Sequence, residues 1–157
     1  MGLDMYLEAR KFVSGYDWEK AGTESYQALK VVFGIETSDD IPDGNPTGTV
    51  GLSVMYWRKA NAIHKWFVDN CQGGNDDCGE YYVSNEKLTD LRETCEEVLK
   101  NRDAANDLLP PASGFFFGAD ELDEYYWEYV EHTAEVIGKL LTHPTYGDAT
   151  FYYSSSW

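Results

Sequence analysis

The spacing of apolar positions predicts several strands along the chain. Residues 3–13 alternate, with Leu3, Met5 and Leu7 on one side and mostly charged or tyrosine side chains between them. A period of two is typical of a strand that buries one face and leaves the other in water. Further runs rich in β-branched and aromatic residues predict strands at 29–35, 50–55, 80–83 and 149–153, and the apolar run 114–118 fits a buried strand or a tight aromatic loop.

Apolar residues at helical spacing predict three longer helices. The first covers residues 55–70 and turns Trp57 and Phe67 toward the core. Two further helices are expected at 84–101, behind the N-cap residue Ser84, and at 120–143, with a short helical turn at 103–109.

The order of these elements favours an α+β fold. We expect one globular domain, 1–157, with a mainly antiparallel sheet and about three helices packed on one of its faces. The pattern weakens from residue 14 to residue 27. Residues 38–49 are rich in proline, glycine and aspartate, which predicts a mobile loop.

Two polar residues lie on the apolar side of the helix expected at 55–70. Asn61 and His64 must find hydrogen-bond partners there, because an unpaired buried amide or imidazole costs free energy. One interpretation is a satisfied core pair that fixes the helix orientation. The other is the floor of a ligand pocket with Arg58 and Lys65 on its rim, where two cations would suit a phosphate or a nucleotide.

A carboxylate beside His64 would extend the pocket interpretation. Glu80 and Asp120 are the candidates for a general acid–base pair with this histidine, although the sequence cannot show that contact. The chain has no phosphate-binding glycine loop and no nucleophile elbow. No catalytic residue is therefore predicted; the sequence favours a protein without turnover and leaves a weak enzyme open as the alternative.

The charge balance excludes two classes of partner. The 157 residues include 12 Lys and Arg against 28 Asp and Glu, a net charge of −16. Such a chain is not expected to bind nucleic acid directly or to lie on an anionic membrane. It suits a basic protein surface, including one that normally holds nucleic acid, although solubility alone also explains the charge. The candidate partner surface is a series of glutamates along the last helix, at Glu121, Glu124, Glu128, Glu131 and Glu135.

The cysteines indicate a reducing compartment. Their number is odd, at Cys71, Cys78 and Cys95, and no secretory leader or membrane-spanning run is present, which favours the cytoplasm. Cys95 lies on an apolar helical stripe and is expected in the core. A zinc site from His64, Cys71 and Cys78 would lack an evident fourth ligand, so no metal or cofactor is predicted.

Several segments resemble a family of small uncharacterised phage and prophage proteins. The resemblance lies in MGLDMYL, YWRKANAIHKWFVDN, CGEYYVS, LLPPASGFFFG and FYYSSSW. It covers the first predicted strand and most of residues 56–157, and it implies that residues 14–49 are an insertion. It implies phage origin and an accessory role in the bacterial host cytoplasm, such as countering a defence system in the manner of an anti-CRISPR protein. Together with the charge, it predicts an acidic inhibitor that binds a host defence protein or nucleoprotein complex. The alternative is a protein that binds a small phosphate ligand, or a weak enzyme, using Arg58, Asn61 and His64.

Overall fold

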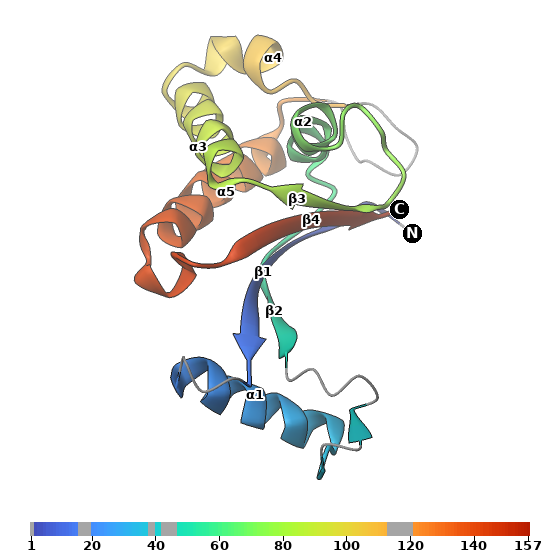
Figure 1. Ribbon diagram of the computed structural model, residues 1–157. Coiled ribbons are helices and arrows are strands. Elements are labelled where there is room, and N and C mark those ends of the chain that lie inside the picture. Colours follow the sequence, from blue (N-terminus) through green and yellow to red (C-terminus); the bar gives the residue numbers. More distant parts are fainter. Residues whose placement is uncertain (1, 16–19, 38–39, 42–46, 113–120) are drawn as a thin grey trace. The chain divides into compact units, whose positions relative to one another are not determined.

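The structure is a computed structural model that describes residues 2–15, 20–37, 40–41, 47–112 and 121–157 (Figure 1). Its elements are β1 (Asp4–Ser14), α1 (Lys20–Phe33), β2 (Thr47–Arg58), α2 (Asn61–Cys71), β3 (Glu80–Val83), α3 (Asn85–Lys100), α4 (Ala105–Leu108), α5 (Glu124–Thr142) and β4 (Thr150–Ser156). The four described strands form one sheet in the order β2-β1-β4-β3. The predicted α+β fold is confirmed, and α1 is the long helix that the sequence pattern missed. Within the described residues, no helix is both long and apolar enough to cross a membrane.

The described chain divides into two compact units. The larger comprises Met1–Ala9 and Ser53–Trp157, and the smaller comprises Arg10–Leu52. The smaller unit contains α1, the end of β1 and the beginning of β2. Most of the predicted mobile loop, and all of the apolar run 114–118, lie outside the described residues.

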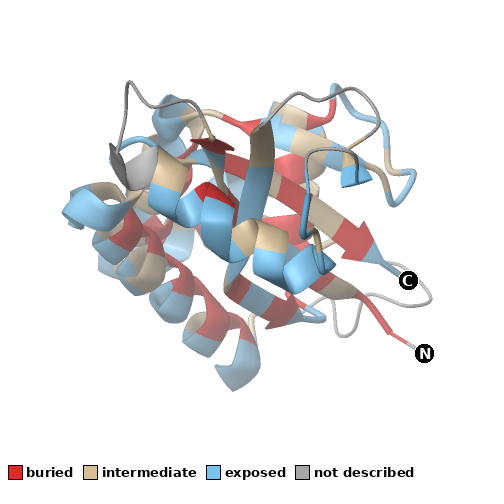
Figure 2. Cartoon of the chain, turned by 60° about the horizontal axis from the view of Figure 1, so that its bottom comes forward, coloured by how far each residue is buried: buried red, intermediate tan, exposed pale blue. Residues whose placement is uncertain are grey.

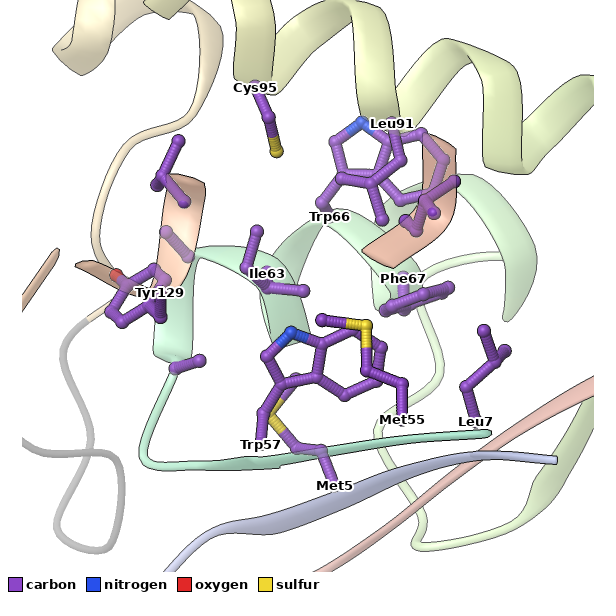
Figure 3. Packing of buried hydrophobic residues seen from close by; sticks show 14 of the residues in the cluster. Met5, Leu7, Met55, Trp57, Ile63, Trp66, Phe67, Leu91, Cys95 and Tyr129 are labelled. Carbon is purple, nitrogen blue, oxygen red and sulfur yellow. The ribbon is translucent and has the colours of Figure 1, made fainter. Parts of the chain in front are cut away.

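The larger unit is built around β4 and the helices on one side of the sheet (Figure 1). β3 pairs antiparallel with β4, so that Val83 faces Phe151 and Glu80 faces Ser154. Buried and more exposed residues alternate along β4 and the first part of β1 (Figure 2), as the period of two predicts. The helix α2 fills the space above the sheet with Ile63 and Phe67, which pack among side chains of β1 and β2 (Figure 3).

The helix predicted at 55–70 is wrong in its first part. Residues Met55 to Arg58 belong to β2, and α2 begins only at Asn61. The four residues MYWR are too few to distinguish the helical period from the strand period. Their contacts with the neighbouring strand and the core stabilise the strand conformation. Lys59, with a φ of 56°, breaks the strand before the helix begins.

The strand predicted at 29–35 is also wrong. Residues 29–33 complete α1, although valine and phenylalanine favour strands. The helix ends where Gly34 adopts a φ of 69°, and the N–H of Ile35 donates to the carbonyl of Lys30 over 2.9 Å. Local propensity is a weak guide when a helix that started earlier continues through the segment.

The cap of α3 and the core cysteine agree with the sequence. The Ser84 hydroxyl accepts a hydrogen bond from the N–H of Lys87 over 3.2 Å, which caps α3. α5 ends before Pro144 as predicted, but it begins only at Glu124, because Asp123 caps it there; the predicted start at residue 120 is wrong for the described residues 121–123. Cys95 is fully buried between the helices, as predicted.

Replacing Trp57 should strongly destabilise the fold. This indole is 3% exposed, packs against Phe67 and donates a 2.8 Å hydrogen bond to the Thr133 hydroxyl. Trp57→Ala should therefore lower the free energy of unfolding by about 3–5 kcal/mol in a denaturant titration. Arg58→Ala, at the next and exposed position, is the control and should change it little. A loss below about 1 kcal/mol for Trp57→Ala would contradict the packing.

Removing β4 should prevent folding. The strand lies between β1 and β3, and it contributes the buried Phe151 and Tyr153 to the core. A chain that ends at residue 150 should therefore aggregate or lack a cooperative melting transition in circular dichroism. A chain that lacks only Trp157 is the control and should still melt cooperatively. An unchanged melting curve for the shorter chain would show that β4 is dispensable.

Candidate functional site

The helix α2 holds a buried imidazole between two later parts of the chain. His64 is 1% exposed. Its Nδ1 lies 2.7 Å from the hydroxyl of Tyr153, and its Nε2 lies 3.1 Å from Oδ2 of Asp76. An imidazole that leaves water needs a partner at each nitrogen, and both nitrogens have one within the protein.

A carboxylate links this histidine to the end of the chain. Asp76 is 28% exposed, and its Oδ1 accepts a 3.1 Å hydrogen bond from the indole N–H of Trp157. A continuous series of hydrogen bonds therefore joins Trp157, Asp76, His64 and Tyr153. The series ties the loop after α2 to both α2 and β4.

The network is better suited to fixing geometry than to reacting with a substrate. Burial raises the pKa of Tyr153 well above its usual range, so its hydroxyl stays protonated. Its ring stacks on Phe67 with centroids 4.0 Å apart. An imidazole that is 1% exposed offers almost no surface to a solute.

The buried thiols are poor nucleophiles. Burial raises the pKa of Cys71 to about 11 and that of Cys95 to about 12. Both are neutral thiols at neutral pH, whereas the thiolate is the reactive and metal-binding form. Among the residues that the structure describes, no group of three or more His, Cys, Asp or Glu side chains could hold a metal ion.

The residues of the predicted pocket occupy different surroundings. Arg58 is exposed at the end of β2, and its carbonyl accepts a hydrogen bond from the Tyr125 hydroxyl. Asn61 is 1% exposed, and its Oδ1 accepts a 3.3 Å hydrogen bond from the N–H of Ala112. Glu80 is exposed at the start of β3, and Asp120 lies outside the described residues.

Lys65 faces a separate hollow on the surface. Its Nζ lies 2.6 Å from Oδ2 of Asp69, four residues later on the same helix. The hollow measures about 360 Å³ and lies between α2 and the segment around α4. It is lined by Ala62, Lys65, Trp66, Asp69, Asn70, Asp107, Leu108, Leu109 and Pro110. Arg58, Asn61 and His64 are not part of this lining.

Asp76 is the site residue that the sequence did not indicate. Its neighbours Asn75 and Asp77 suggest a solvated acidic turn, and Asp77 does form such a turn by accepting the N–H of Gly79. Asp76 instead points its carboxylate at His64, 12 residues earlier. The buried His64 was the signal that could have identified Asp76, because its imidazole needed a hydrogen-bond partner and Asp76 follows shortly after the same helix.

The glutamates of the last helix form an outward acidic stripe. Glu124, Glu128, Glu131 and Glu135 are exposed on α5, whereas Glu121, which the sequence placed on the same helix, is exposed just before the helix begins. The opposite face of α5 buries Tyr126, Val130, Thr133, Ile137 and Leu140. Lys139 pairs with Glu135 at 2.5 Å and lowers the pKa of that carboxyl. Within the described part of the chain, no lysine or arginine forms an ion pair with the other four. We call this set the α5 stripe.

Comparison with protein-family models, with curated proteins and with solved structures gave no match. The family resemblance and its implications therefore stay predictions.

Replacing His64 should cost stability because its partners would lose their hydrogen bonds. His64→Ala leaves a cavity and removes the imidazole from both the Tyr153 hydroxyl and the Asp76 carboxylate. We expect a loss of about 2–4 kcal/mol in the free energy of unfolding. The control is His132→Ala, an exposed histidine on α5, which should change the value by less than about 0.5 kcal/mol. Equal effects of the two substitutions would contradict the network.

Proposed function

We propose that this protein is a phage-derived accessory protein that binds and inhibits a host defence protein or nucleoprotein complex through the α5 stripe. The observation that carries the proposal is a row of glutamates on a helix whose other face is fixed in the core. The phage origin and the defence target rest on the family resemblance.

The stripe has the geometry of a rigid negative rod. Glu124, Glu128, Glu131 and Glu135 follow one another at intervals of three or four residues, which keeps them on one side of the helix. At a rise of about 1.5 Å per residue they extend over about 16 Å. Because the helix is already packed, little conformational entropy is lost when a basic groove binds it.

The adjacent helix adds to the negative field. α3 packs directly against α5 and buries Leu88, Leu91, Cys95 and Val98, while its Glu93 and Glu97 are exposed. A groove built to hold nucleic acid carries lysines and arginines, and such a surface attracts this field over about a Debye length, ~8 Å at physiological salt.

A phosphate-binding function has less support. The hollow beside Lys65 also contains Asp69 and Asp107, and Asp69 already neutralises the lysine. Two carboxylates repel a phosphate, and Asn61 and His64 have protein partners. The proposed protein therefore acts by occupying its target and has no turnover of its own.

Charge reversal on the α5 stripe should remove inhibition without unfolding the domain. Glu128→Lys with Glu131→Lys is the variant of choice, because both side chains are exposed and neither is ion-paired in the described structure. Co-expression with phage challenge in strains that carry defined defence systems measures inhibition, and the purified target complex then measures Kd. We expect the reversal to weaken binding at least about tenfold, and added salt to weaken the unmodified protein's binding.

The matched control changes the net charge equally at other exposed positions. Glu36→Lys with Asp107→Lys should leave inhibition and Kd unchanged, and melting curves should be similar for all three proteins. If only substitutions at Arg58, Asn61 and His64 abolish activity, the α5 stripe is not the functional surface. A thermal-shift screen with nucleotides would then test the ligand-binding alternative, since a bound ligand raises the midpoint.

A further inference from the structure

Exposed hydrocarbon side chains are concentrated in the smaller unit. In the described parts of the chain, seven large exposed side chains carry no polar atom, namely Phe12, Val31, Val32, Phe33, Val50, Leu52 and Leu108, and the first six belong to Arg10–Leu52. The other large exposed side chains are tyrosines and a tryptophan, which have a polar group for water. Exposed apolar side chains concentrated in one unit favour an interaction site on that unit.

The strand β2 adds an open sheet edge to this surface. It is the first strand in the order β2-β1-β4-β3, so among the described strands it has a neighbour on one side only. Residues 49–53 are all exposed, including Val50 at 45% and Leu52 at 58%. Residues 47–57 contain no charged side chain and no proline, although these are the usual devices that keep an edge from pairing with another strand.

The opposite edge of the sheet is different. β3 has only 4 residues, against 12 in β2, and it begins with the exposed Glu80. A short edge with a charge resists the addition of a strand. The sheet is thus protected at β3 and open at β2.

We propose that β2 pairs antiparallel with β2 of a second copy of this chain. A two-fold axis through Gly51 would place Val50 of each copy opposite Leu52 of the other, in an isologous contact. The pairing would satisfy main-chain groups along the edge and bring the exposed Val50 and Leu52 of the two copies into contact. It is independent of the function proposed for the α5 stripe.

The charge distribution selects a second copy over a basic partner. A basic strand would need carboxylates opposite it, and residues 47–57 have none. The smaller unit holds 4 Lys and Arg against 7 Asp and Glu, whereas the rest of the chain holds 8 against 21. Two chains of net charge −16 therefore meet with least repulsion along this uncharged strand.

The oligomeric state of the full chain tests this pairing. Light scattering coupled to size exclusion should give a mass near twice 17.8 kDa at high protein concentration. Leu52→Lys places two cations at the symmetric contact and should raise the dimer Kd at least about tenfold. The control is Tyr82→Lys on β3, because Tyr82 and Leu52 are both 58% exposed on edge strands. The control should remain dimeric.

Hydrogen exchange and salt separate strand pairing from other contacts. Within 49–52, the amides that point away from β1, which are every second one along the strand, should gain protection as concentration rises in the unmodified chain and not in Leu52→Lys. Added salt should preserve or strengthen the dimer, because it screens the repulsion between acidic chains, whereas it should weaken binding at the α5 stripe. A monomer at every concentration, a dimer that both variants weaken equally, or a dimer without protection at 49–52 would overturn the proposal.

Discussion

The contact between α2 and β4 is the constraint on which the larger unit depends. Phe67 stacks on Tyr153, and the hydroxyl of the same tyrosine faces Nδ1 of His64. The ring can be buried only where its hydroxyl finds a partner, and the imidazole can be buried only where both nitrogens do. The two side chains satisfy each other, and Asp76 supplies the remaining bond. This pairing fixes the rotation of α2 over the sheet and the position of the chain's last strand.

The parts of the fold that followed from sequence are those with a local cause. β1 shows a long period-two pattern, and α3 and α5 have capping residues and apolar stripes that agree with each other. The errors occurred where two local preferences compete. Met55 to Arg58 match both periods, and the end of α1 is rich in strand-forming residues. Only pairing with β1 or continuation of a helix settles these cases, and neither is encoded within the short segment itself.

The candidate site shows the same division between local and long-range information. The sequence singled out Asn61 and His64 because a polar residue on an apolar face needs a partner, and both side chains are buried with protein partners. The sequence could not identify those partners. Tyr153 lies 89 positions from His64 and Ala112 lies 51 from Asn61, so only the folded topology brings them together. Asp76 was obscured by acidic neighbours that do face water.

The two proposed surfaces also explain why the chain distributes its charge unevenly. A uniform charge of −16 would oppose self-association as strongly as it attracts a basic partner. Glutamates gathered on α5 and α3 give a strong field where a basic groove would bind, and the long uncharged run in β2 leaves a neutral edge. The two proposed contacts are then compatible, because the β2 pairing uses uncharged residues and does not use the glutamates of the α5 stripe. An acidic protein that must both remain soluble and pair with itself needs this separation, since a carboxylate on β2 would face its own copy across a two-fold axis.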